Sequence, residues 1–513
     1  MVLFFIFLSL VWPTIVADST CRFAKEFSTE DLVASQSKRE KFIALAMEYE
    51  GRFNQPSVGY NGPSGHTYDS HLIDYRTGEL QTSFNAFSAP SKEAIHVTIL
   101  ALALDENPLG EIYVKAGNEG VNSQTRIIDI LTRKISTYEK FRETYPGYGG
   151  YMPWVTVNDT GIHPTRGYQN PYQCPSLDNG ELIWALYLIY NVLNDRGYGA
   201  LGKRYKSQFD AMIKYGKMMF YEGNGIVSGK IIIKNASATP FPDNYAPQGS
   251  YSLDDPYEGE LFTVFLDLFA DWGSNESDRD AMWIAKRSQL ASVNYETPRG
   301  PITVQEGWHY SSHEMWKFLE LPYVDVPLVR RLFENGERVR TWNSDLKGIP
   351  GLYAAVHDVS RDDDVRGYFV PGISEVARAK STRFDVVTPY GAFPTILANL
   401  SVGIAWYHNM LLGQKMQGPY GSTEGANVNG TEISPIVSWD TKQTTIVALL
   451  GGAGASIGKY LKRESGAKYQ RFYDVIQREY GMKFPSIKGE DLGYKLPRTQ
   501  IPTTHLEDFS SCR

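Results

Sequence analysis

Helical periodicity dominates this chain of 513 residues and constrains its fold more than any other feature. Apolar residues recur every three to four positions, which is typical of α-helices with one buried face. Glycine and proline clusters separate these stretches, and the clearest strand candidate is the segment 226–234. The expected helices lie at about 37–53, 92–105, 123–144, 179–197, 201–222, 257–272, 277–295, 311–322, 326–343, 393–415, 443–464 and 467–481.

The expected helices fall into two kinds. The segments 181–193, 396–412 and 444–457 are apolar on all sides, as helices enclosed by other helices must be. The segments 201–222 and 277–290 are amphipathic and basic, as helices at the surface are. Because no linker or repeat divides the chain, we expect one all-α domain over residues 18–513. The arrangement predicted is an (α/α)6 barrel of six inner and six outer helices, with a few short strands in its loops.

The first 17 residues form an apolar segment of signal-peptide length that ends in the small residue Ala17. We therefore expect a secreted, extracellular protein with no membrane attachment after cleavage; the alternative is an uncleaved anchor. Of the three cysteines, Cys21 and Cys512 lie near the two ends of the mature chain, and their pairing is favoured because it would close the domain. Five sequons agree with secretion and predict glycosylation at Asn158, Asn235, Asn275, Asn399 and Asn429.

The composition excludes several functional classes. With 51 basic and 58 acidic residues, the net charge of −7 gives no reason to expect nucleic acid or an anionic membrane as a partner. The chain has no P-loop and no G-x-S-x-G motif, and no cofactor is expected. Aromatic residues make up 13% of the chain, and their flat faces suit sugar rings as well as protein cores.

The strongest chemical signal is the motif DDPYEGEL at 254–261. Its structural interpretation is a helix start, with Asp255 as N-cap, Pro256 at the first position and Glu258 in a capping box. On a helix that starts there, Glu258 lines up with an apolar stripe, whereas Glu260 lies on the polar face. Burial beside that stripe would raise the pKa of Glu258, as a general acid needs, while the positive helix end opposes the rise. Both interpretations stay open.

A second acid, Asp440, follows a long segment rich in glycine, asparagine and serine at about 415–439. Asp440 could also be only a helix cap, with Gln443 three residues later. Long segments without obvious structure are uncommon unless they are functional. This one could form a cleft wall, with Tyr420, Ser422, Thr423 and Glu424 facing a substrate.

His309 and His313 stand four residues apart within the aromatic sequence EGWHYSSHEMW. That spacing could hold a metal on one helix face. Trp308 and Trp316 beside them fit a sugar-contact surface better, and a purely structural role is the third possibility. We therefore expect no metal site.

Five segments together resemble one family: SLDNGELIWA, DDPYEGEL, VQEGWHYSSHEMWK, QGPYGSTEG and SWDTKQ. They look like the eukaryotic endo-β-1,2-glucanases of glycoside hydrolase family 162, which are related in fold to the bacterial family 144. The resemblance implies a single (α/α)6-barrel catalytic domain that cleaves linear β-1,2-glucan to sophoro-oligosaccharides with inversion. It implies Glu258 as general acid, with Glu260 as the competing choice, and Asp440 as a general base that reaches water through a substrate hydroxyl. The expected sugar contacts are Asn179, Tyr257, Glu260, Trp308, His309, His313, Trp316, Tyr420, Ser422, Thr423 and Glu424.

Two other functions share these sequence features. The first is an (α/α)-barrel hydrolase or lyase that acts on another polysaccharide. The second is a secreted glycan-binding protein without activity, in which both acids only cap helices. The expected partner in every case is a polysaccharide, and we expect the protein to be a monomer.

Overall fold

The computed structural model describes residues 21–512 except 119, 166–171, 250, 274–275 and 364–366. The predicted signal peptide at 1–17 and the sequon at Asn275 lie outside the described residues. The α-helices are α1 (Thr29–Ala34), α2 (Gln36–Gly51), α3 (Pro90–Leu104), α4 (Pro108–Lys115), α5 (Ser123–Thr144), α6 (Ser176–Asp195), α7 (Gly199–Phe220), α8 (Glu260–Phe269), α9 (Glu276–Gln289), α10 (Lys317–Glu320), α11 (Pro327–Lys347), α12 (Phe393–Ala398), α13 (Leu400–Leu411), α14 (Thr444–Leu449), α15 (Gly454–Glu464) and α16 (Gly466–Lys483).

The strands are short and form small antiparallel sheets of two or three strands in the described part of the chain. They decorate the connections between helices, so the prediction of an all-α fold is confirmed. Their bounds are β1 (Ser70–Ile73), β2 (Leu80–Asn85), β3 (Phe87–Ser88), β4 (Val155–Asn158), β5 (Gly161–Pro164), β6 (Tyr172–Pro175), β7 (Tyr221–Gly223), β8 (Ile226–Val227), β9 (Lys230–Ile233), β10 (Tyr245–Pro247), β11 (Ser292–Thr297), β12 (Gly300–Gln305), β13 (Val356–His357), β14 (Tyr368–Phe369), β15 (Val386–Val387), β16 (Gln417–Gly418), β17 (Gly421–Ser422), β18 (Gly425–Asn427), β19 (Ile433–Ser434) and β20 (Ile436–Ser438).

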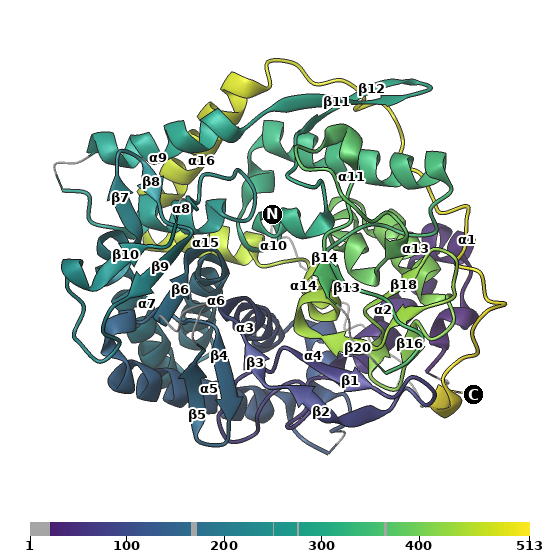
Figure 1. The fold of residues 1–513 in the computed structure, drawn as a ribbon, viewed down its shortest axis with the longest axis horizontal. Coiled ribbons are helices and arrows are strands. Elements are labelled where there is room, and N and C mark those ends of the chain that lie inside the picture. The colour runs from purple at the N-terminus through teal and green to yellow at the C-terminus, as the bar shows by residue number, and fades with distance from the viewer. Residues whose placement is uncertain are drawn as a thin grey trace, which may run out of the picture.

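The helices are arranged around the middle of the molecule, with α3, α6, α10 and α14 close to it and α5, α7, α9 and α16 toward the rim (Figure 1). Every residue of α3 and of α14 is buried, and α6 is buried over most of its length. Helix α6 packs between α3 and α8, and α14 packs against α3 and α12. The rim helices α7 and α9 bury one side only, as their amphipathic sequences predict.

Several helices differ from their predicted bounds. Helix α8 begins at Glu260 with Gly259 as its N-cap, so the predicted capping box at Asp255 and Glu258 is wrong. The segment 277–295 ends as a helix at Gln289 and continues into β11. The segment 311–322 is a 3₁₀ turn, η4 (Ser312–Met315), followed by the short α10.

Two long predicted helices are each broken into two. The segment 393–415 divides at Asn399, whose extended backbone ends α12 and whose side-chain oxygen accepts a hydrogen bond from Val402 N at 3.2 Å to cap α13. The segment 443–464 divides at Gly451 and Gly452, whose φ values of 94° and 72° no helix accommodates. Helices α1 and α4 were not expected, because each is too short to show periodicity.

The two ends of the described chain are joined. A disulfide links Cys21 to Cys512, the pair that the sequence favours, at a sequence separation of 491. The segment after α16 runs along the edge of the molecule to reach this point (yellow in Figure 1), and Arg22 Nε lies 3.1 Å from Asp508 Oδ1. Cys174 is free and buried.

None of the described helices is both long and apolar enough to cross a membrane.

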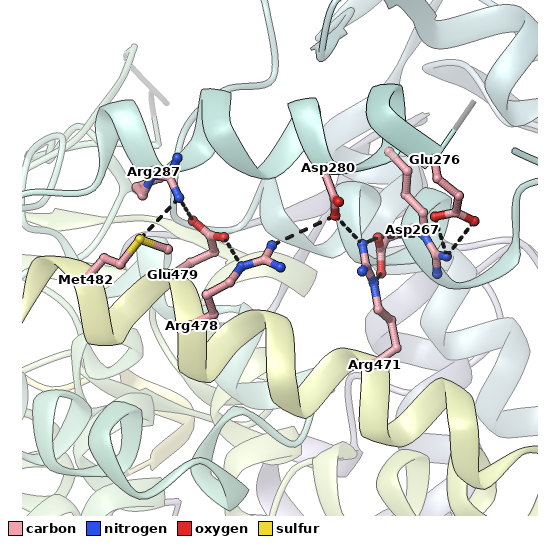
Figure 2. A network of polar contacts seen from close by, with 9 residues as sticks. Asp267, Glu276, Asp280, Arg287, Arg471, Arg478, Glu479 and Met482 are labelled. Atoms are coloured by element: carbon pink, nitrogen blue, oxygen red, sulfur yellow. Dashed lines mark hydrogen bonds and ion pairs between the residues drawn. The ribbon is translucent and has the colours of Figure 1, made fainter. Parts of the chain in front are cut away.

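A network of charged side chains fastens the rim helices α9 and α16 to α8 (Figure 2). Its centre is Asp267 on α8, a buried carboxylate that lies 3.0 Å from Arg279 Nε and 2.8 Å from Arg471 Nη2. Asp280, which is half exposed, lies 2.9 Å from the same Arg471. Because α8 starts two residues after Glu258, this network also supports the position of that acid.

Replacing Asp267 with Asn should lower the free energy of unfolding by about 1–3 kcal/mol, because two guanidinium groups lose their shared buried carboxylate. Asp280→Asn is the matched control and should cost less than about 1 kcal/mol, because that carboxylate is half exposed. Urea titration of both variants measures the difference, and equal costs would contradict the central position of Asp267.

Candidate active site

Acidic residues gather where three inner segments begin. Asp178 and Glu181 lie near the start of α6, Glu258 lies just before α8, and Asp440 lies in η8 (Trp439–Gln443), the π-turn that leads into α14. The charges of Asp178 and Asp440 both act on the carboxyl group of Glu258. Residues that are 262 positions apart in the chain thus share one electrostatic environment, because their helices pack around the same interior.

Glu258 is held in a tight turn rather than on a helix. Asp255 Oδ2 accepts hydrogen bonds at 3.2 Å from Tyr257 N and from Gly259 N, and Lys286 Nζ donates to Asp255 O at 2.7 Å. A side chain at position 259 would collide with Asp255, since a Cβ there would lie 2.2 Å from Oδ1. The turn therefore requires glycine next to Glu258.

The carboxyl group of Glu258 makes no hydrogen bond or ion pair with the described residues. Its side chain is half-buried among protein atoms. Burial, followed by the charges of Asp255 and Glu314, raises the pKa of Glu258 well above its usual value. A carboxyl with a raised pKa that binds none of the described residues can act as a general acid.

Asp440, in contrast to Glu258, is paired with a cation. Lys92 Nζ on the buried helix α3 lies 2.6 Å from Asp440 Oδ2. Burial raises the pKa of Asp440, and the ammonium of Lys92 opposes that rise. The preceding Trp439 anchors the turn by donating from Nε1 to Gly59 O at 2.6 Å and by stacking on His96 with ring centroids 4.5 Å apart. A carboxylate beside a fixed cation suits a general base.

Trp308, His309 and His313, which the sequence predicts as sugar contacts, lie together before and within η4. Trp308 is 53% exposed, which is unusual for tryptophan. The buried Glu314 carboxylate accepts from Trp308 N at 3.0 Å and from His309 N at 2.7 Å, so it fixes this segment. Burial lowers the pKa of His313 to about 3, and its Nδ1 has no partner among the described residues. Burial lowers the pKa of both histidines, which favours their neutral forms.

Four other predicted contacts have their polar groups bound within the protein. The buried Asn179 amide donates to Met152 O and Pro175 O at 2.8 and 2.6 Å, and Tyr257 OH donates to Glu306 O at 2.7 Å. Glu260 is buried beside Lys317 and Tyr323, at 3.2 and 2.6 Å, rather than on a polar surface. Trp316 Nε1 donates to Tyr390 OH at 2.6 Å.

The composition of the segment 415–439 suggested that it lacks regular structure, and the structure contradicts this expectation. The segment contains β16 to β20 and is mostly buried. Ser422 N donates to Glu50 Oε1 at 2.7 Å, and Thr423 Oγ1 donates to Lys415 O at 2.6 Å. The buried Glu424 binds His357 Nδ1 at 2.7 Å, whereas Tyr420 is half exposed. Short strand pairs satisfy the backbone hydrogen-bonding groups of this segment, which has few apolar side chains.

Several residues that were not expected from the sequence share this environment. Only the helical pattern of α3 carried a signal for Lys92, since a lysine at the start of a mostly apolar helix needs a partner once that helix is buried. The others depend on packing between distant segments and had no signal of their own. The residues not expected from the sequence are Asp69, Lys92, Asp178, Glu181, His357, Tyr368 and Tyr390.

Two carboxyl groups with different electrostatic settings in one environment are what a glycoside hydrolase uses as acid and base. The family model described as "Endo-beta-1,2-glucanase SGL", of glycoside hydrolase family 162, matches residues 66–513. The chain therefore belongs to the endo-β-1,2-glucanase family, and the resemblance drawn from its sequence is confirmed.

Solved structures agree with this assignment. The endo-β-1,2-glucanase from Talaromyces funiculosus in complex with sophorose is 38% identical, with a TM-score of 0.92 over 97% of this chain and 100% of that chain. A glutamate-to-glutamine variant of that enzyme with β-1,2-glucan matches equally well. An endo-β-1,2-glucanase from Chitinophaga pinensis is 13% identical, with a TM-score of 0.56 over 86% and 97% of the two chains, and shows the fold alone. No curated protein matches the chain.

His357 should make stability fall at alkaline pH. Although burial lowers its pKa, Glu424 together with Asp69 and Asp440 outweighs burial and raises the pKa from 6.5 to about 9. Because the folded pKa lies above the unfolded one, the stabilisation is complete below about pH 6.5 and is lost as the pH rises through about 9. Urea unfolding should show a loss of about 2–3 kcal/mol between pH 6 and 10 that is absent from His357→Asn. An equal loss in the variant would contradict this origin.

Proposed function

We propose that this protein is a secreted, endo-acting glycoside hydrolase that cleaves linear β-1,2-glucan to sophoro-oligosaccharides with inversion. One observation supports it above the others: the Glu258 carboxyl has no partner among the described residues and has a raised pKa, whereas Asp440 pairs with Lys92 at 2.6 Å in the same environment. The similarity to an enzyme solved with β-1,2-glucan and with sophorose supports the substrate.

In the proposed mechanism, Glu258 donates its proton to the glycosidic oxygen as the bond to the anomeric carbon breaks. Positive charge develops on the sugar ring, and water attacks from the opposite face. Asp440 receives the water's proton through a substrate hydroxyl, which passes on its own proton as it gains one from water. One bond is hydrolysed, and the proton that left Glu258 is balanced by the one that reaches Asp440.

We further propose that Trp308 covers a sugar face while His309 and His313 bind hydroxyl groups. Tyr420 would contact substrate directly. The buried Ser422, Thr423 and Glu424 would act by holding the cleft wall.

The remaining proposals concern the whole chain. Residues 18–513 would form one (α/α)6 catalytic domain after removal of a signal peptide at 1–17, supported by the buried α3, α6 and α14 and the half-buried rim helices. The disulfide and the exposed sequon residues Asn158, Asn235 and Asn429 suit an extracellular protein. Asn399 caps α13 and is half-buried, so glycosylation there would compete with the cap.

The first test is incubation of the purified protein with linear β-1,2-glucan. Short oligosaccharides should appear from the earliest times, and NMR should show the new reducing ends first as the α-anomer, because inversion converts a β-linkage. A β-anomer would contradict inversion. Cleavage of a different polysaccharide alone would overturn the substrate, and binding without turnover would support a sugar-binding protein.

The second test replaces the two acids. Glu258→Gln and Asp440→Asn should each lower kcat/KM by about 10²- to 10⁴-fold, because each removes a proton-transfer group. The melting temperature of Glu258→Gln should change little, since the Glu258 carboxyl binds none of the residues that the structure describes.

Glu260→Gln is the matched control for the choice between the two glutamates. It should lower the melting temperature, because Lys317 loses a buried carboxylate at 3.2 Å. An active Glu258→Gln variant beside an inactive but stable Glu260→Gln variant would reverse the assignment.

A further inference from the structure

Asp440 depends on one neighbouring cation. Its Oδ2 accepts from Lys92 Nζ at 2.6 Å, and its Oδ1 is buried without a hydrogen-bond partner among the described residues. A buried carboxylate with one unpartnered oxygen is costly unless a cation lies beside it. Lys92 supplies that cation from the third residue of α3, a helix that is buried throughout.

Lys92 is itself held by a second carboxylate. Asp69 Oδ1 lies 3.5 Å from Lys92 Nζ, and Asp69 Oδ2 accepts from Ser70 Oγ at 2.9 Å and from Asn85 Nδ2 at 3.2 Å. Strand β1 pairs with β20 so that Ser70 lies opposite Ser438, which places Asp69 beside the turn that carries Asp440. The ammonium group thus lies between two carboxylates brought together by a strand pairing.

The other titratable groups near Asp440 offer it no second cation of this kind. Glu93 on α3 is bound to Lys134 at 2.7 Å, and burial lowers the pKa of His96 far enough to keep it neutral. His357 is paired with Glu424 at 2.7 Å. The remaining groups in this environment are acidic or phenolic: Asp69, Asp178, Glu181, Glu258, Tyr368 and Tyr390.

We propose that Lys92 is a positioning residue that assigns the base role to Asp440: its ammonium keeps Asp440 ionised while Glu258, which lacks such a partner, keeps its proton. The inference deepens the proposed function and rests on Asp440 as the general base. One lysine then separates the protonation states of two carboxyl groups that share one environment. Asp69 holds the lysine and, as a negative charge, limits its effect.

The test is the pH dependence of kcat/KM on linear β-1,2-glucan. The acid limb reports ionisation of the base in the free enzyme. Lys92→Met should move this limb upward by about 1–3 pH units, because Asp440 loses its cation. Lys92→Arg keeps the charge and should restore the limb toward the wild-type position, and the alkaline limb, set by Glu258, should move less in both variants.

The Asp69→Asn variant should shift the acid limb in the direction opposite to that expected for Lys92→Met. Removing a negative charge near Asp440 should move the acid limb downward, because Asp69 raises the pKa of that carboxyl. Where Lys92→Met fails to fold, an acid limb that Asp69→Asn leaves unmoved or moves upward overturns the proposal. Shifts of Asp69→Asn and Lys92→Met in the same direction would overturn the proposal.

Lys442→Met is the matched structural control. Lys442 is buried and lies on the same turn as Asp440, but its Nζ binds Glu50 at 2.7 Å. Its loss should lower the melting temperature and leave the position of the acid limb unchanged. If Lys92→Met also lowers activity at every pH without moving the limb, Lys92 is only structural.

The failure of this inference differs from the failure of the proposed function. An Asp440→Asn variant that keeps its activity shows that Asp440 is not the base. An inactive Asp440→Asn variant, combined with an unshifted Lys92→Met profile, rejects only the role of Lys92.

Discussion

The burial of the inner helices is the constraint on which the rest of the structure depends. A helix such as α3, with every residue buried, must give its charged groups partners inside the protein. Glu93 meets Lys134 on α5, and Lys92 meets Asp440 before α14. These ion pairs set how the inner helices sit against their neighbours, and they place charge in the interior where substrate chemistry can use it.

The candidate active site is a consequence of that packing. Its acids come from the starts of α6, α8 and α14, and a buried cation stands beside only one of the proposed catalytic pair. Burial raises the pKa of both Glu258 and Asp440, so burial alone would make them alike. The position of Lys92 makes them different, which is what acid and base chemistry at one pH requires.

Much of the fold could be predicted from periodicity, because long helices repeat the same pattern over several turns. Helices α5 and α7 show this, with bounds equal or close to the expected ones. The turn at Glu258 could not be predicted in this way. Its motif satisfies the rules of a capping box, yet Asp255 binds the backbone of 257 and 259 in a turn ahead of the helix. The same local hydrogen-bond chemistry serves both conformations, and packing selects one.

The sequence by itself determined the class of fold, the family and the two acids proposed for catalysis, because periodicity and short motifs are local properties of the chain. Only the tertiary structure decided that Glu260 and Asn179 bind within the protein, and that Lys92 faces Asp440 across 348 residues. Such contacts depend on which helices pack together. The physical reason is that the energy of a buried charge is set by its neighbours in space, which the order of residues does not reveal.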